Sequence, residues 1–382
     1  MQFSEILGQE HIKNHLTKSA ELGRIPHAQL FVGPEGSGTL AMAIAYAQYI
    51  LCGNQNGENS GPNEACNLKF QKTSHPDLHF AYPTVTTEEV KKNPKSIDFI
   101  VDWRKFLSQT PYGGLFEWYA ILGVQNKQGE IRVDDAQEIL KSLSLKSYEG
   151  GYKVMIVWMA DKLNIAASNK LLKLLEEPPA KTVFILISEN EEDIIQTIRS
   201  RCQILRFNGL SEPIIAEALV SREKLDPSLA MKIAHQAQGN YNIALHLLHD
   251  DNDKFPFEQW FVTWVRAAFQ AKKDASAIQD LILWSEKIAS LGRETQKKFL
   301  EFCIEMFRQA LLINYETPSL VYFEPKVDKF KLENFAPFVN GNNIHDIFKE
   351  LSDAMYHVER NGNAKIILTD LSIKLTRLIH KK

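Results

Sequence analysis

The sequence has few cysteines and no long apolar run, and each absence excludes a class of protein. Four cysteines in 382 residues are too few for a disulfide framework, so we expect a reduced, cytoplasmic protein. No stretch reaches the roughly 18 apolar residues that a membrane span requires. The first residues also lack the basic and apolar segments of a secretory signal. We therefore expect no membrane partner.

An excess of either charge is also missing. The 44 Lys and Arg residues nearly balance the 47 Asp and Glu residues, which gives a net charge of −3. The overall field therefore offers no general attraction to nucleic acid. Basic pairs such as Lys91-Lys92 and Lys297-Lys298 are interpreted as solvated surface charges. A DNA-binding adaptor stays an alternative, and it predicts clustered cations and binding that weakens steeply with salt.

Alternating patterns in the first two-thirds of the chain predict an α/β fold. Helical patterns at Gly38–Cys52, Val133–Leu143 and Ile165–Leu175 fall between short apolar runs. The run Lys153–Met159 is apolar almost throughout, which is typical of a strand buried on both faces of a parallel sheet. The predicted strands are Ala28–Val32, His79–Tyr82, Lys153–Met159, Thr182–Ile187 and Ile204–Phe207.

The length and the change of pattern after Phe207 predict three domains. We place an α/β domain at residues 1–208, with an insertion at about 84–129 that the sequence does not explain. Short helical patterns occupy residues 209–250. Residues 251–382 show helical spacing throughout, and we interpret the aromatics of 255–269 and 299–307 as bundle core rather than a ligand pocket.

A glycine-rich segment follows the first predicted strand. Gly33, Gly36 and Gly38 stand between that strand and a helix, which is the context of a phosphate-binding loop. A working loop continues with Lys, which contacts the β and γ phosphates, and Ser or Thr, which holds Mg²⁺. Here Thr39 and Leu40 occupy those positions. Since a charge-assisted hydrogen bond contributes ~1.5–3 kcal/mol, we expect weak or absent nucleotide binding and no nucleotide cofactor. A glycine turn without this role is the alternative.

Two further motifs bear on phosphate chemistry. The apolar strand ending at Met159 is followed by Asp161 and Lys162, where an ATPase would have an acidic pair that holds Mg²⁺ and activates water. A lysine cannot act as that base, so we interpret this as a degenerate acidic site. The alternative is that Asp161 only caps the strand. The segment Ser200-Arg201-Cys202 offers an arginine able to stabilise charge on a neighbour's phosphoryl group, or an ordinary surface arginine beside a buried cysteine.

These motifs together resemble the AAA+ clamp-loader family of bacterial DNA polymerase III, and within it the delta-prime type of subunit. The resemblance covers about residues 1–210 and is loose beyond. Its segments are Phe3, Ile6–Gln9, Arg24–Ala28, Leu30–Pro34, His75–Asp77, Ile131–Asp134, Glu149–Val154, Asn169–Pro179 and Thr197–Cys202, with Asn361–Lys365 as a late match.

The resemblance implies a P-loop-type parallel sheet, a small helical lid domain and a helical collar domain that joins subunits. It implies a non-catalytic subunit of a hetero-oligomeric loader, which opens the sliding clamp and places it on primer-template DNA during replication. The partners would be gamma/tau and delta subunits. Arg201 would be an arginine finger that completes the ATP site of gamma/tau, with Ser200 and Cys202 placing it.

The chain departs from the family pattern at its nucleotide sensor and its zinc module. Asn242 stands where the ATPase subunits have an arginine, which agrees with an inactive site. Only Cys52 and Cys66 of a four-cysteine zinc module are present, and His75 and His79 would be needed to complete a ligand set. We expect a degenerate module without zinc. An active gamma/tau-type ATPase is the remaining alternative, and it would need Lys at Thr39 and Glu at Lys162.

Overall fold

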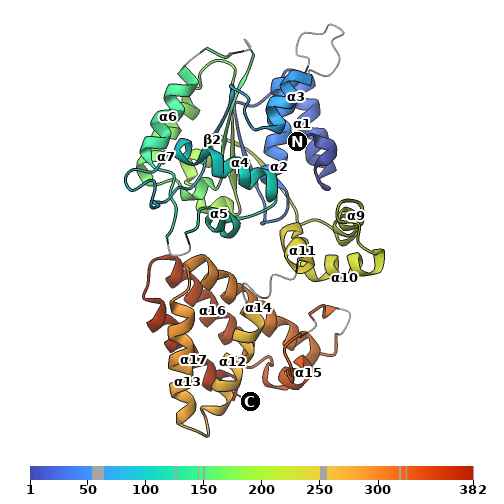
Figure 1. Ribbon diagram of the computed structural model, residues 1–382, viewed down its shortest axis with the longest axis vertical. Helices are drawn as coiled ribbons and strands as arrows, with labels where there is room; N and C mark the ends of the chain where they lie inside the picture. The colour runs from blue at the N-terminus through green and yellow to red at the C-terminus, as the bar shows by residue number, and fades with distance from the viewer. Residues whose placement is uncertain are drawn as a thin grey trace. The chain divides into compact units, whose positions relative to one another are not determined.

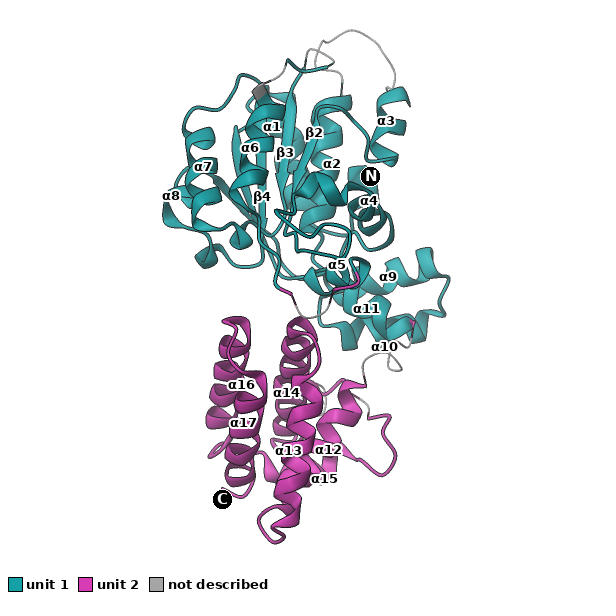
Figure 2. Ribbon diagram, turned by 60° about the vertical axis from the view of Figure 1, so that its left-hand side comes forward, with its two compact units in different colours: residues 1–122, 128–248 teal, residues 123–127, 249–382 magenta. Residues whose placement is uncertain are grey.

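The computed structural model describes residues 1–53, 64–124, 127–144, 146–148, 151–249, 256–317, 320–323 and 325–381. It divides into two compact units, one of residues 1–122 and 128–248 and the other of residues 123–127 and 249–382 (Figures 1 and 2). None of the described helices has the length and apolarity that crossing a bilayer demands.

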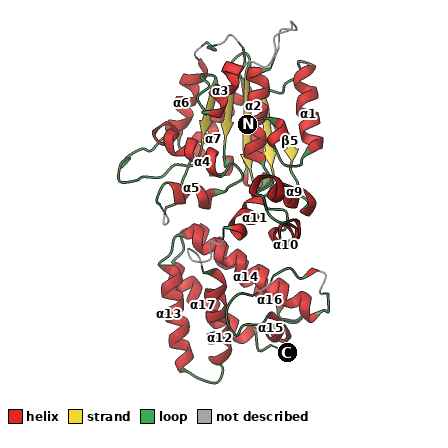
Figure 3. Ribbon diagram, turned by 45° about the vertical axis from the view of Figure 1, so that its right-hand side comes forward, coloured by secondary structure: helices red, strands yellow, loops and turns green. Residues whose placement is uncertain are grey.

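The first unit is built on a parallel five-stranded sheet with the order β2-β3-β4-β1-β5 (Figure 3). Every residue of β1, β3 and β4 is buried, since helices cover the sheet and apolar side chains project from both faces of the strands. The predicted parallel α/β fold is thereby confirmed. The strands are β1 (Ala28–Val32), β2 (Leu78–Ala81), β3 (Lys153–Val157), β4 (Thr182–Ser188) and β5 (Gln203–Arg206).

Helices flank this sheet. Helix α2 packs against β1, β3 and β4, while Ile139 of α6 and Leu171 of α7 join the core that the strands form. Asn164 caps α7 by accepting a hydrogen bond of 2.8 Å from the N–H of Ala167, as its sequence position predicts. The helices are α1 (Glu10–Glu21), α2 (Thr39–Cys52), α3 (Glu64–Gln71), α4 (Ile100–Gln109), α5 (Leu115–Ile121), α6 (Val133–Ser144), α7 (Ile165–Glu176) and α8 (Gln196–Arg199).

The insertion at 84–129 is anchored by an aromatic cluster. The ring of Trp103 stacks on Tyr82 at a centroid distance of 4.1 Å and meets Trp118 edge-on at 5.3 Å. Phe106 and Trp158 complete the cluster, so side chains of α4 and α5 pack onto the ends of β2 and β3. Aromatic pairs of this kind stabilise beyond their buried area. Residues 84–122 of the insertion are therefore a packed part of the first unit, whereas residues 123–127 group with the second unit.

Three helices follow the sheet in the same unit. They are α9 (Glu212–Glu223), α10 (Pro227–Ala237) and α11 (Tyr241–Leu248). Since the contacts group them with the sheet, the three-domain division at 208 and 250 stays a prediction.

The described residues of the second unit from 256 onward form helices joined by loops, with no strand among them. Trp264 stacks on Trp284 at 5.0 Å, and Phe261, Phe299 and Phe307 lie fully buried in one core. The predicted aromatic bundle core is confirmed for these residues, Phe255 lies outside the described residues, and Phe269 departs from the prediction because it is 40% exposed. The helices are α12 (Phe257–Gln270), α13 (Ser276–Ala289), α14 (Arg293–Asn314), α15 (Leu332–Phe335), α16 (Ile344–Glu359) and α17 (Ala364–Leu378).

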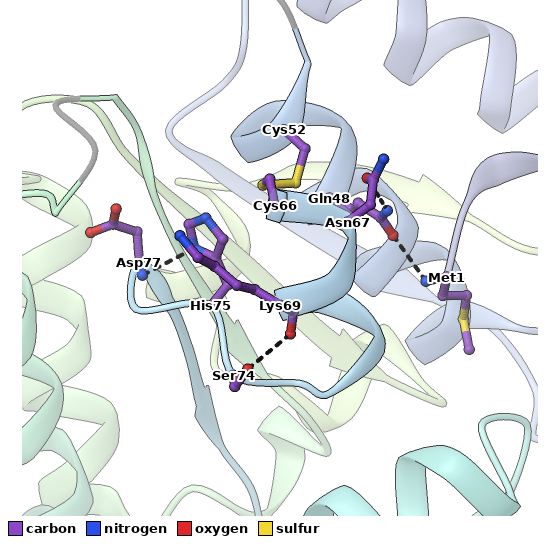
Figure 4. The surroundings of a disulfide bond; sticks show 9 residues. All are labelled: Met1, Gln48, Cys52, Cys66, Asn67, Lys69, Ser74, His75 and Asp77. Atoms are coloured by element: carbon purple, nitrogen blue, oxygen red, sulfur yellow. Dashed lines mark hydrogen bonds between the residues drawn. A yellow bond between two sulfur atoms is a disulfide. The ribbon is translucent and has the colours of Figure 1, made fainter. Parts of the chain in front are cut away.

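The two cysteines that were expected to be reduced remnants of a metal module form a disulfide (Figure 4). Cys52 ends α2 and Cys66 lies in α3, and their Cα atoms are 5.6 Å apart, within the range that a disulfide spans. The expectation of a reduced chain is therefore wrong for this pair. A count of cysteines argues against a framework of disulfides, but it says nothing about two helices that tertiary packing brings together.

Candidate functional site

The glycine-rich loop leaves β1 and leads directly into α2, as predicted. Gly36 and Gly38 have φ angles of 75° and 90°, in the left-handed region that favours glycine. The chain itself approaches these glycines closely. A Cβ at Gly36 would overlap the side chain of Asn240, and a Cβ at Gly38 would lie 2.8 Å from Cε1 of Tyr112. The glycines therefore admit protein side chains where a phosphate would otherwise approach.

Tyr112, which follows α4 in the insertion, covers the loop. Its hydroxyl accepts a hydrogen bond of 2.9 Å from the N–H of Leu7, and its ring meets that of Tyr241 edge-on at 5.1 Å. The cavity that remains beside Gly36, Gly38 and Thr39 has a volume of about 20 Å³. Since one water needs roughly 10–15 Å³, this space holds about one water.

Residues at the start of α11 also contact the glycine-rich loop. The side-chain amide of Asn242 donates to Oε1 of Glu35 at 3.1 Å, and the N–H of Tyr241 donates to the carbonyl of Gly36 at 3.3 Å. Asn242 is buried, at 3% exposure. The residue at the sensor position thus binds the loop itself.

A second contact ties α11 to the insertion. His246 of α11 lies 2.9 Å from Oε1 of Glu117, whose other oxygen accepts from the N–H of Gly114 at the start of α5. The insertion, α11 and the glycine-rich loop are consequently held to one another by side chains. The sequence did not point to Tyr112, Asn240 or Glu117, since no local pattern shows which distant segments pack on the glycine-rich loop.

The degenerate acidic site carries its own compensating charge. The ammonium of Lys162 lies 3.0 Å from Oδ2 of Asp161, and the hydroxyl of Ser188 lies 3.4 Å from Oδ1. Both residues belong to a short turn of 3-10 helix, Ala160–Lys162, that follows β3. Because the adjacent lysine pairs with the carboxylate, a divalent cation at Asp161 would have to displace it.

The structure does not bring Arg201 to the glycine-rich loop. It lies at the surface just after α8, where its Nη2 pairs with Oε1 of Glu176 at the end of α7, 2.5 Å away. Its Nη1 donates to the carbonyl of Thr197 at 2.9 Å. The two paired side chains are 36% and 43% exposed, so the guanidinium is held in cis while open to solvent.

The flanking residues fix the turn that carries Arg201. Ser200 ends α8 and its hydroxyl donates to the carbonyl of Thr197 at 3.1 Å. The side chain of Cys202 packs against the core of the sheet, and burial raises the pKa of its thiol to about 12. Cys202 is thus an anchor in its protonated form and not a reactive thiol.

Comparisons with known proteins place the chain among replication proteins. Residues 8–211 match the family model described as DNA polymerase III, delta subunit. The DNA polymerase III subunit delta' of Bacillus subtilis is 28% identical over 249 residues, which are 65% of this chain and 60% of that protein. The subunit delta' of Escherichia coli is 28% identical over 62% of this chain and 59% of that protein.

Gamma subunits match at a similar level. The DNA polymerase III subunit gamma of Buchnera aphidicola is 28% identical over 64% of this chain and 57% of that protein. The aligned part of this chain thus spans less than two-thirds of the length of each of these relatives. Among solved structures, the alignment with a DNA polymerase III gamma subunit-related protein of Thermotoga maritima covers 97% of this chain and 99% of that protein's chain. The identity is 14% and the TM-score is 0.38.

Proposed function

The chain belongs to the DNA polymerase III delta-subunit family, and we propose that it is a non-catalytic subunit of the clamp loader in DNA replication. In this role it supports loading of the sliding clamp onto primer-template DNA. It does so as one member of a hetero-oligomer with gamma/tau and delta subunits. We further propose that it needs neither a nucleotide nor zinc as a cofactor.

The observation that carries this proposal is the closed glycine-rich loop. Tyr112, Asn240 and Asn242 contact the loop where a nucleotide would lie, and the space left holds about one water. Thr39 and Lys162 add a chemical reason, because the cation for phosphate and the base for water are both missing. An active gamma/tau-type ATPase would need space for the nucleotide, a lysine in place of Thr39 and a glutamate in place of Lys162, and similarity to a gamma subunit does not supply them.

The exposure of Arg201 supports a role at the ATP site of a neighbouring subunit. The pair of Arg201 with Glu176 is exposed, and pairs of this kind contribute only ~0–1 kcal/mol. A polyphosphate on a neighbouring subunit offers more negative charge and bidentate acceptors, which a guanidinium binds well. Arg201 can therefore exchange Glu176 for a partner's phosphate at little cost.

The decisive experiment measures clamp- and DNA-stimulated ATP hydrolysis by the reconstituted loader. Arg201→Ala should remove the finger from one neighbouring site, and fingers of this kind contribute on the order of 10³-fold or more in rate. The loader should lose the share of the rate that this site supplies. Glu176→Gln, which keeps the shape but releases the guanidinium, should preserve or raise the rate.

Arg206→Ala is the matched control. Arg206 lies in β5, is also exposed, and pairs with Glu191 at 2.7 Å, so its removal costs a similar surface ion pair. Equal rates for the Arg201 and Arg206 variants, in loaders that assemble equally well, would make Arg201 a structural residue. ATP turnover by the isolated chain would contradict the non-catalytic role itself.

A further inference from the structure

The second unit contains a pocket that is separate from the glycine-rich loop and from Arg201. It has a volume of about 230 Å³, many times what one water needs, roughly 10–15 Å³. It is lined by one side of α12, by the segment 329–331, by α15 with the turn after it, and by Ile379 after α17. All these elements belong to the same compact unit.

Six of the eleven residues that line this pocket are apolar, and four of these six are phenylalanines. Phe335 belongs to the buried core of the unit, and Phe330 and Phe338 pack against that core. Phe269 stands at the mouth and is 40% exposed, although its ring stacks on His380 at 5.0 Å and meets Phe338 edge-on at 4.9 Å. Both contacts hold the ring in place, so the pocket has a rigid aromatic wall.

The segment that forms one wall is pinned to α12. Glu258 accepts hydrogen bonds from the N–H groups of Lys326 and Val327, at 2.7 and 2.8 Å. About two turns further along α12, Nη2 of Arg266 donates a hydrogen bond of 3.0 Å to the carbonyl of Lys329. The pocket therefore exists before any partner arrives, which lowers the cost of binding.

The rim is positively charged. Arg266, Lys329 and Lys331 line the pocket and are exposed, and among its described lining residues there is no carboxylate. The acidic neighbours Asp328 and Glu333 flank these residues in sequence without lining the pocket. This local excess of positive charge contrasts with the chain as a whole, whose net charge is −3. A partner that carries negative charge beside an apolar group fits both features.

We propose that this pocket binds an acidic segment of a partner protein, with one large apolar side chain, such as phenylalanine, inserted among Phe269, Phe335 and Phe338. Carboxylates on either side of that anchor would pair with Arg266, Lys329 and Lys331. A buried aromatic anchor surrounded by charge pairs at the rim is how small interfaces concentrate their binding energy.

Single-stranded nucleic acid is the competing class, because cations and aromatic rings also serve it. Bases stack on exposed ring faces along a groove. Here one face of Phe269 is covered by His380, and the other apolar side chains line a hollow, so an inserted side chain fits better than a stacked base.

The test is fluorescence anisotropy with the full-length chain. The probe is a labelled short peptide in which one phenylalanine is flanked by aspartates on both sides. We expect saturable binding, lost when lysines replace the aspartates or alanine replaces the phenylalanine. Lys331→Glu should weaken binding about tenfold, since an attraction becomes a repulsion. Lys349→Glu, the same charge change at an exposed position of α16, should leave binding unchanged.

Phe269→Ala tests the aromatic wall and should also weaken binding, with helix content by circular dichroism as the check on folding. Three results would overturn the proposal. They are the absence of saturable peptide binding, equal affinities for the Lys331 and Lys349 variants, and binding of a labelled oligothymidine that depends on Lys331 while the peptide does not bind. Self-association of the chain that Lys331→Glu abolishes would instead identify a second copy as the occupant.

Discussion

Restoring the missing lysine should not by itself restore nucleotide binding. Thr39→Lys places a cation at the position where a phosphate-binding loop has one, and a charge-assisted hydrogen bond contributes ~1.5–3 kcal/mol, or about 10–150-fold in affinity. The cavity beside Thr39 has a volume of only about 20 Å³, because Tyr112 lies over Gly38. We expect the single variant to bind ATP no better than the native chain.

Removing the covering ring should reveal the effect of the lysine. Tyr112 is 5% exposed, so Tyr112→Ala should cost ~3–5 kcal/mol of folding stability, as for other buried aromatic side chains. The free energy of unfolding of natural proteins is ~5–15 kcal/mol, so the variant stays folded where the native value exceeds this cost. Thr39→Lys combined with Tyr112→Ala should bind nucleotide about tenfold or more tightly than Thr39→Lys alone.

Titration with a fluorescent ATP analogue would measure these affinities, and urea unfolding would confirm that each variant is folded. Tyr112→Phe is the matched control, because it removes the hydroxyl, with its contacts to the N–H of Leu7 and to Arg222, and keeps the ring over the loop. Paired with Thr39→Lys it should stay unable to bind. If Thr39→Lys alone binds as well as the double variant, or if neither binds, Tyr112 is not what excludes the nucleotide.

Two further predictions concern the cysteines. With its pKa raised to about 12, the Cys202 thiol should be ~10⁻⁴ ionised at pH 8, against ~10⁻¹ for an ordinary thiol, so its alkylation by iodoacetamide should be slow at pH 8 and should rise about tenfold per pH unit until pH approaches that pKa. Mass spectrometry would follow it, and rapid labelling of the folded chain at pH 8 would contradict the burial of this side chain. Reducing the Cys52–Cys66 disulfide, which joins residues 14 apart, should lower the free energy of unfolding by ~3 kcal/mol. Urea unfolding with and without dithiothreitol would measure the change, and a Cys52→Ser/Cys66→Ser chain should not respond to the reductant.

Local patterns in the sequence predicted most of the secondary structure. The strand Ala28–Val32 has the predicted bounds, and α2, α6 and α7 begin and end within one residue of the predicted ranges, because apolar periodicity and capping residues act over a few positions. Helix α3 was not predicted, since it is short and its apolar spacing is weak. Its place next to α2 depends on contacts such as that of Gln48 with Asn67, which no local pattern shows.

The candidate site divides in the same way. The sequence alone determined the chemical defects, because Thr39, Leu40 and Lys162 lack the groups that phosphate transfer requires wherever they lie. It also identified Arg201 as a candidate. Only the tertiary structure decided that Tyr112 lies over Gly38, 74 residues earlier in the chain, and that Glu176 holds Arg201.

The disulfide of Cys52 with Cys66 and the cationic pocket of the second unit likewise became visible only in the folded chain. The reason is physical. Residue types determine which charges and hydrogen bonds are available, and periodicity determines local backbone structure. Contacts between distant segments depend on how whole elements pack, and the same turn or cysteine can be solvated or buried according to what packs against it.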